Sequence, residues 1–190
     1  MGRKAIEFNM KKTEISEFND NIFNRLSQWA LLSVGDATDF NTMTVSWGGI
    51  GVLWGKSVCI VAVRTSRHTF TYSEKVNSFT LSFFGGKEKE ALAFCGANSS
   101  RDIDKIKSTG LVPITLSGKY VSFDTADLCI CCDKIYSIDM DKGEFFDNKI
   151  LPAFYNADNS NDMHKIYICE IKDIYATPPV EDTSINNIKN

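Results

Sequence analysis

Two clusters of side chains suited to binding anions occur in the sequence, and the first follows directly on an apolar run. Val58–Val63 is short and rich in β-branched residues, so it predicts a strand buried on both faces. Residues 64–69 then read RTSRHT, with two guanidinium groups and three hydroxyls. Guanidinium forks and hydroxyl donors match phosphate oxygens. This segment predicts a phosphate site made by Arg64, Ser66, Arg67 and Thr69, with a solvated turn that caps the strand as the alternative.

The second cluster is Asn98–Asp102, which precedes a predicted helix through Ile103, Ile106 and Lys107. Its serines or Asp102 are suitable N-caps. Exposed N–H groups at the start of that helix, beside Arg101 and Lys105, would form the second half of an anion site. An ordinary capped surface helix is the alternative.

A place for a flat ring is indicated by the segment between Asn41 and Gly51. Residues 41–47 predict a strand with partial alternation, and the sequence GGIG after it lets backbone approach backbone or ligand closely. Met43 or Trp47 would supply a flat apolar neighbour, with backbone N–H groups and short polar side chains at the ring edge. Simple core packing is the alternative for Trp47 and Trp54.

The remaining patterns predict mostly strands. We expect strands over 28–34, 79–84, 119–123, 126–138 and 164–171, a helical turn over 21–26 and another over 71–75, and a helix over 87–95 that ends at Gly96. Several strands with short turns and few helices favour a mainly β fold, a closed antiparallel barrel decorated by helices. A Rossmann fold is excluded, because no strand leads into G-x-G-x-x-G.

A single domain is expected from the length of 190 residues. We assign residues 1–20 to an N-terminal arm or short edge strand, 21–176 to the domain and 177–190 to a flexible tail. The polar segment 141–161, with its isolated aromatic residues, is interpreted as a loop that closes over a pocket or reaches a partner subunit. A packed loop without a ligand role is the alternative.

Composition excludes several classes of function. A net charge of −3 with interspersed acids and bases argues against nucleic acid as a partner. The absence of a bilayer-length apolar run and of an apolar leader predicts a soluble cytoplasmic protein without a membrane partner. The six cysteines lie in strand patterns without the spacing of a zinc site, so we expect buried reduced thiols and no metal.

Four sequence pieces together resemble a known family. They are NTMT followed by SWGG, the buried strand that ends in R-x-SRHT, the strand NSFTLSFF, and FCG-x-x-SSRD-x-DK. In this order and spacing they resemble the flavin reductase-like proteins, and among them the flavoredoxin-type branch with an FMN-binding split barrel. The resemblance spans roughly residues 20 to 175. It implies an antiparallel barrel of Greek-key type.

The resemblance also implies the parts of an FMN site. The phosphate would lie among Arg64, Ser66, Arg67 and Thr69, with Ser100, Arg101 and Lys105 nearby; Lys105 is also a candidate for a positive charge at the flavin N1 side. The backbone and side chains of seven residues would meet the pyrimidine edge: Asn41, Thr42, Met43, Thr44, Val45, Ser46 and Trp47. Phe84 belongs to the expected cofactor-binding set. His164, in the pattern H-x-x-Y-I-x-E-I, stands where the family places a histidine at the flavin.

Three functions are consistent with these residues. In the first, NADH or NADPH passes a hydride to FMN, which reduces free flavin or another acceptor; the chemistry then occurs on the cofactor and demands no acid or base from the protein. In the second, the protein is an electron carrier, like flavoredoxin, with little nicotinamide oxidation and with a redox protein as partner. The third is a flavin-free barrel that binds another ligand or partner. The resemblance further implies a homodimer with the cofactor near the interface. The nicotinamide preference and the final acceptor stay open, and so does the role of segment 141–161 and of the tail.

Overall fold

The computed structural model describes residues 10–155 and 162–178. Eight strands form one antiparallel sheet in the order β3-β2-β6-β9-β10-β5-β4, with β1 paired to β10, and β7 pairs with β8. The strands are β1 Lys11–Thr13, β2 Ala30–Gly35, β3 Phe40–Val45, β4 Gly48–Leu53, β5 Lys56–Arg64, β6 Ser78–Phe83, β7 Pro113–Leu116, β8 Tyr120–Phe123, β9 Leu128–Asp139 and β10 His164–Ala176. Neighbours such as β2 and β6 are not consecutive along the chain, which is the Greek-key type of connection.

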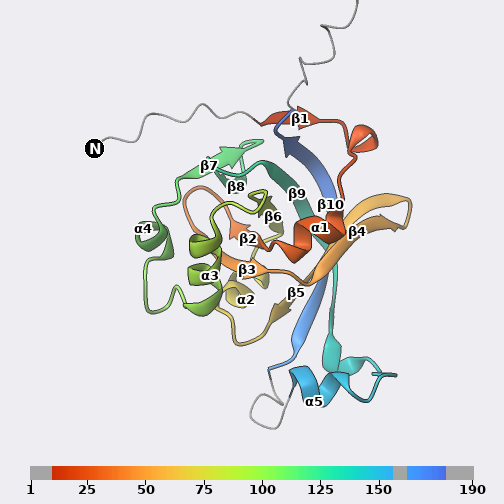
Figure 1. Cartoon of the computed structure of the whole chain (residues 1–190). Helices are drawn as coiled ribbons and strands as arrows, with labels where there is room; N and C mark the ends of the chain where they lie inside the picture. Colours follow the sequence, from red (N-terminus) through yellow and green to blue (C-terminus); the bar gives the residue numbers. More distant parts are fainter. Residues whose placement is uncertain (1–9, 156–161, 179–190) are drawn as a thin grey trace, which may run out of the picture.

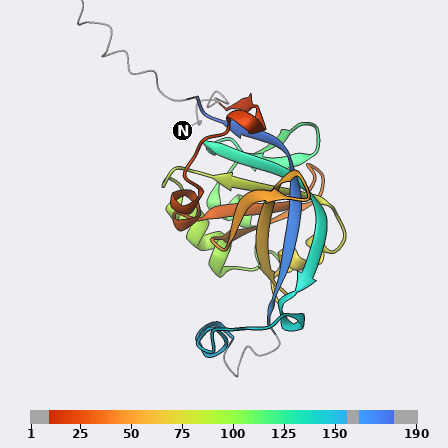
Figure 2. The ribbon, with the colours of Figure 1, turned by 90° about the vertical axis from the view of Figure 1, so that its right-hand side faces the viewer.

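Short helices decorate this sheet. They are η1 Ile15–Glu17, α1 Ile22–Ser27, α2 His68–Ser73, α3 Lys89–Ala97, α4 Lys105–Thr109, η2 Met140–Lys142 and α5 Ile150–Phe154. Figure 1 shows the curled sheet with α2, α3 and α4 on one side, β1 at one end of the barrel and α5 beyond the other. In the turned view of Figure 2, α5 and the segment before it again lie beyond the barrel. The expected antiparallel barrel with a few helices is confirmed.

Two apolar cores lie on the two faces of the same strands. In β2, Leu32 faces the barrel interior, while its neighbour Leu31 packs in a second core with α3, β7 and β8. In β9, Ile130 faces the interior and Cys131 the second core. Because successive side chains of a strand point to opposite faces, a strand with a core on each side shows no polar alternation. This explains the apolar runs Ala30–Leu32 in β2 and Leu128–Cys132 in β9.

The cysteines are free thiols, and all six are buried. Cys59, Cys132 and Cys169 lie in the barrel core, whereas Cys129 and Cys131 lie in the second core. Burial raises the pKa of the Cys129 thiol to about 12. The buried Cys129 thiol is therefore protonated at neutral pH, and buried thiols pack as small apolar side chains.

The glycine segment after Trp47 differs from the expectation, because it forms strand β4 instead of a break. Gly48 is the glycine that the fold requires: with φ at +159° it lies so close to β5 that a Cβ would be 2.2 Å from the carbonyl oxygen of Ile60. A Cβ on Gly49 or Gly51 would meet nothing within 4 Å. The close backbone approach therefore occurs at the start of the segment, where the chain crosses from β3 to pair with β5.

Other boundaries moved by a few residues. The second half of the expected arm forms β1 and η1, and β1 pairs with the end of β10, which continues to Ala176. Segment 141–161 includes the end of η2 and all of α5. Residues 1–9, 156–161 and 179–190, and with them most of the expected tail, lie outside the described residues. Within the described ranges, no helix has the length and apolar character needed to span a bilayer.

Replacing Tyr167 by phenylalanine should lower the free energy of unfolding by about 1 kcal/mol, the usual net value of a buried hydrogen bond. The fully buried Tyr167 hydroxyl donates to Glu74 Oε1 at 2.7 Å and receives the Ser73 hydroxyl at 3.1 Å, which ties the end of α2 to β10. Urea unfolding measures the change. The matched control is Tyr136→Phe, because the side chain of Tyr136 is 43% exposed; equal stability of the two variants would contradict the prediction.

Candidate functional site

Two adjoining cavities lie where β5 ends and β10 begins. The first has a volume of about 310 Å³ and is lined by Met43, Arg64, Ser66, Arg67, His68, Thr69, Ala97, Asn98, Ser99, Arg101, Lys105 and Asp162. The second has a volume of about 240 Å³ and is lined by Met43, Thr44, Val45, Ser46, Trp47, Ala62, Arg64, Arg67 and His164. Met43, Arg64 and Arg67 line both, so the two cavities share a wall.

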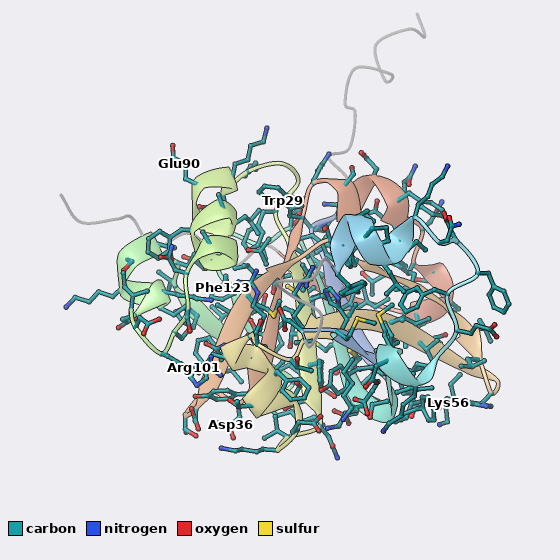
Figure 3. All side chains as sticks on the ribbon, turned by 90° about the horizontal axis from the view of Figure 1, so that it is seen from below. Trp29, Asp36, Lys56, Glu90, Arg101 and Phe123 are labelled. Carbon is teal, nitrogen blue, oxygen red and sulfur yellow. The ribbon has the colours of Figure 1, made fainter. Side chains whose placement is uncertain are left out.

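The pairing of β5 with β10 brings these residues together. In its antiparallel register Arg64 lies opposite His164, and Thr65 donates its backbone N–H to the carbonyl oxygen of Met163. The turn after Arg64 leads into α2, which begins at His68. The loop between α3 and α4 approaches from the other side, where Arg101 donates to the carbonyl oxygen of Ser66 at 3.1 Å. Arg101 lies beside α2 in the view from below in Figure 3.

The predicted anion cradle holds a carboxylate, that of Asp162. The backbone N–H and the hydroxyl of Ser66 both donate to this carboxylate at 2.8 Å, and the hydroxyl of Thr65 donates at 3.3 Å. The Arg64 guanidinium is 3.6 Å from it. Burial pushes the pKa of Asp162 upward, but the hydrogen bonds from Ser66 and the charge of Arg64 outweigh burial and hold that pKa below its ordinary value. In this structure the donors of the segment therefore hold a carboxylate of the chain itself.

Lys105 and Arg67 donate to backbone carbonyl oxygens of β3 and α3. Lys105 is 5% exposed, and its ammonium donates to the carbonyl oxygens of Thr42 and Cys95 at 2.9 Å each. Burial lowers the pKa of this ammonium. Arg67 donates to the carbonyl oxygen of Gly96 at 2.8 Å. Both side chains hold the end of α3 against the site while their positive charges line the first cavity.

The polar side chains of β3 form hydrogen bonds with other groups of the chain. The sequence had suggested that they contact the edge of a ligand ring. Asn41 donates to the Thr69 hydroxyl at 2.7 Å, Thr42 donates to the carbonyl oxygen of Leu32 at 3.2 Å, and Thr44 donates to that of Leu92. Neither Asn41 nor Thr42 lines the two adjoining cavities. What this strand offers the second cavity comes from its later part, from Met43 to Trp47.

Neither Phe84 nor Ser100 lines the two cavities. Phe84 is 2% exposed in the second core, with its ring centroid 6.3 Å from that of Phe123. Ser100 lines a third cavity with Asn41 and Thr42, and this cavity shares His68, Arg101 and Lys105 with the first. Helix α4 begins later than expected, because its N-cap is Asp104, whose side chain accepts the N–H of Lys107. Its first residue, Lys105, lines the first cavity together with Asn98, Ser99 and Arg101 of the preceding loop.

The second cavity has an aromatic wall around His164. The Trp47 ring lies 4.8 Å from the His164 ring and 5.2 Å from that of Phe154 of α5. The Tyr155 hydroxyl is 2.6 Å from His164 Nδ1, and the Arg64 guanidinium lies 5.2 Å from the centre of the Tyr155 ring. Burial, and after it the charge of Arg64, lowers the pKa of His164 to about 4. The imidazole is therefore neutral at physiological pH.

Two residues of this site, Asp162 and Tyr155, were missed by the sequence interpretation. Asp162 lies two positions before His164, and Tyr155 lies within segment 141–161, which was interpreted as a loop. Neither carries a recognisable local motif. The signal that could have found Asp162 is its position just before the last strand. If that strand pairs antiparallel with β5, its first residues lie next to the RTSRHT turn that follows β5.

Comparisons with known proteins agree with this architecture. No protein-family model matches the chain, and no curated protein matches it in sequence. Among solved structures, it is similar to an FMN-binding domain of a flavin reductases-like enzyme from Shewanella baltica (14% identity, TM-score 0.62, 89% of this chain and 78% of that one). It is similar to flavoredoxin from Methanosarcina acetivorans (19% identity, TM-score 0.57, 78% of this chain and 67% of that one). It is also similar to the NADH:FAD oxidoreductase of Streptomyces globisporus (12% identity, TM-score 0.56, 80% of this chain and 78% of that one). The chain thus has the FMN-binding split-barrel fold of flavin reductase-like proteins and flavoredoxins, the fold that its sequence motifs predict.

Proposed function

We propose that the protein is an FMN-dependent oxidoreductase that transfers a hydride from NADH or NADPH to flavin, and from there to free flavin or another acceptor. The observation that carries this proposal is the anion cradle of Ser66 and Arg64, which opens beside a cavity walled by Trp47 and His164 on a split-barrel fold. An elongated ligand with a phosphate at one end and a flat ring at the other suits this pair of cavities.

The donor set of the first cavity fits a phosphate. Asp162 is a stand-in for that anion, because its carboxylate already accepts the N–H and hydroxyl of Ser66. Among the described residues that line the cavity, Asp162 is the single acidic one, and the cationic ones are Arg64, Arg67, Arg101 and Lys105. With four positive charges and one negative charge, the cavity favours a dianion over a neutral group. FMN phosphate would therefore compete with Asp162 for the Ser66 donors.

The second cavity fits a planar ring. Met43 and Trp47 supply apolar surface, and the backbone from Thr44 to Ser46 supplies polar groups at its edge. FMN, when bound, supplies the hydride chemistry, and the chain supplies placement and charge. Because His164 stays neutral, it adds no charge to the ring side. Arg64 and Arg67 line both cavities and bring positive charge to each.

The experiment that tests the proposal is an absorbance spectrum of the FMN-reconstituted protein, repeated after anaerobic addition of NADH and then of NADPH. We expect flavin bands that bleach with one or both donors, because a hydride that reaches the flavin abolishes its oxidised absorbance. Steady-state turnover with added free FMN then measures transfer to an acceptor.

The other outcomes separate the competing functions. Bound flavin that neither nicotinamide bleaches would contradict the reductase and favour an electron carrier that works with a redox protein, as the name of its structural neighbour flavoredoxin suggests. A protein that takes up no FMN would contradict both, and a flavin-free binding role would remain.

Replacing Asp162 by asparagine should tighten FMN binding about tenfold, which corresponds to ~1.4 kcal/mol of removed competition and repulsion. The asparagine keeps an oxygen for the Ser66 N–H but loses the charge that opposes a phosphate. Isothermal titration calorimetry with FMN measures the change, and riboflavin is the control ligand because it lacks the phosphate. Asp141→Asn, an exposed acid of η2, is the control variant. Equal gains for FMN and riboflavin would contradict the competition.

We further propose that the protein is a homodimer with the flavin near the interface. Exposed apolar side chains on and beside α5 support this: Phe146 is 90% exposed, Phe154 is 48% exposed and Leu151 is 41% exposed. This segment extends beyond the barrel in Figures 1 and 2, and it borders the second cavity through the contact of Phe154 with Trp47. Exposed apolar side chains grouped in this way mark interaction surfaces.

The dimer predicts a mass of twice 21.3 kDa by light scattering at micromolar concentration. Phe146→Ser should shift the equilibrium toward the monomer, because it removes apolar area from the interface. The control is Phe23→Ser, since Phe23 of α1 is 91% exposed yet lies away from α5. A wild-type monomer mass would contradict the proposal.

A further inference from the structure

His164 and Tyr155 form a hydrogen-bonded pair at the wall of the second cavity. His164 is 7% exposed at the start of β10, and its Nδ1 atom is 2.6 Å from the Tyr155 hydroxyl. The two rings meet nearly at right angles, 81°, with 5.6 Å between centroids. Trp47 packs against the other side of the imidazole. The ring is therefore held in one orientation by contacts from β10, α5 and the β3–β4 connection.

The direction of this hydrogen bond follows from the acceptors around the hydroxyl. A tyrosine hydroxyl has one proton to donate. Among the described residues, its two neighbours are His164 Nδ1 at 2.6 Å and the sulfur of Met140 at 3.6 Å. A thioether is a weak acceptor, whereas the unprotonated nitrogen of a neutral imidazole is a strong one. The hydroxyl therefore donates to Nδ1, which leaves the imidazole proton on Nε2.

The charges around the pair keep the imidazole neutral. Arg64 of β5 and Arg67 face it with positive charge, and Asp162 opposes them with negative charge. Burial is the largest influence and, with Arg64, lowers the pKa of His164 to about 4. Burial also raises the pKa of Tyr155, so its hydroxyl keeps its proton. Both partners thus have the protonation states that the hydrogen bond requires.

We propose that Tyr155 is a positioning residue that fixes His164 in the Nε2–H tautomer, so that the imidazole gives the second cavity a hydrogen-bond donor for a ligand carbonyl oxygen. A neutral imidazole can place its proton on either nitrogen, and the partner of one nitrogen decides which. Without the Tyr155 hydroxyl, both tautomers of His164 are populated. The Nε2–H donor then faces the cavity in only a fraction of the molecules. The role toward a ligand rests on the proposed function, whereas the tautomer is a property of the chain itself.

Nitrogen-15 NMR of histidine-labelled protein at neutral pH tests the tautomer directly. The sequence contains two histidines, so the spectrum holds two imidazole spin systems, and His68→Gln identifies the other. We expect the His164 signals of a proton-bearing Nε2 and a proton-free Nδ1. In Tyr155→Phe, the ratio of the Nε2–H to the Nδ1–H form should fall about tenfold, the factor that the loss of one good hydrogen bond gives.

Tyr72 provides a matched control. Its ring packs against His68 at 5.4 Å and 85°, almost the geometry of Tyr155 on His164, but its hydroxyl donates to Asp39. Tyr72→Phe should leave the tautomers of both histidines unchanged. An Nδ1–H form of His164 in the wild type, or a Tyr155→Phe spectrum equal to the wild type, would overturn the proposal. The wild-type spectrum alone tests the tautomer of His164, so the proposal can still be overturned if Tyr155→Phe does not fold.

Adding ligands to the labelled protein identifies the carbonyl that His164 meets. A shift of the Nε2–H signal with FMN points to a flavin carbonyl, and a shift that appears only when NAD⁺ is added to the FMN-loaded protein points to the nicotinamide carboxamide. Both shifts should shrink in Tyr155→Phe and persist in Tyr72→Phe. No shift with either ligand, although FMN binds, overturns the donor role. Failure to bind FMN would instead overturn the proposed function, and the tautomer of the free protein would still be measured.

Discussion

The antiparallel pairing of β5 with β10 is the interaction on which the site depends. Its register sets Arg64 opposite His164, and it carries Asp162 to the turn that contains Ser66. A slip of one residue would turn every side chain of β10 to the opposite face of the sheet. Tyr167 and Ile171 would then leave the barrel core, so the same apolar packing that closes the barrel also holds the register of the site.

Buried polar side chains position the loops around this pair of strands. The ammonium of Lys105 joins β3 to the end of α3 through two carbonyl oxygens, and Asn41 joins β3 to α2 through Thr69. Each of these groups would be costly to bury without its partner. They therefore fix the positions of the cationic side chains that line the first cavity. Asp162 offsets part of that charge within the chain itself.

Much of the fold was predictable because its signals are local. The β-branched run of β5 and the alternation of β6 indicated strands, and the clustered hydroxyls and guanidinium groups after Arg64 indicated an anion site. The strand formed by the glycine segment was missed, because Gly48–Leu53 has low strand propensity and is held by its pairing with β5. The start of α4 was misjudged, because several residues of that loop are suitable caps and the packing of Lys105 selects Asp104.

By itself, the sequence determined the type of fold and the chemistry of the turn after β5, since hydrophobic pattern and side-chain class are properties of a short segment. Only the tertiary structure decided which donors face a cavity. Lys105 and Asn41 donate to acceptors on other elements, Phe84 lies in the second core, and Asp162 and Tyr155 enter the site. The physical reason is that a polar group binds whichever partner packing brings within reach. The register of β5 and β10, for example, sets His164 opposite Arg64, about 100 residues earlier in the chain.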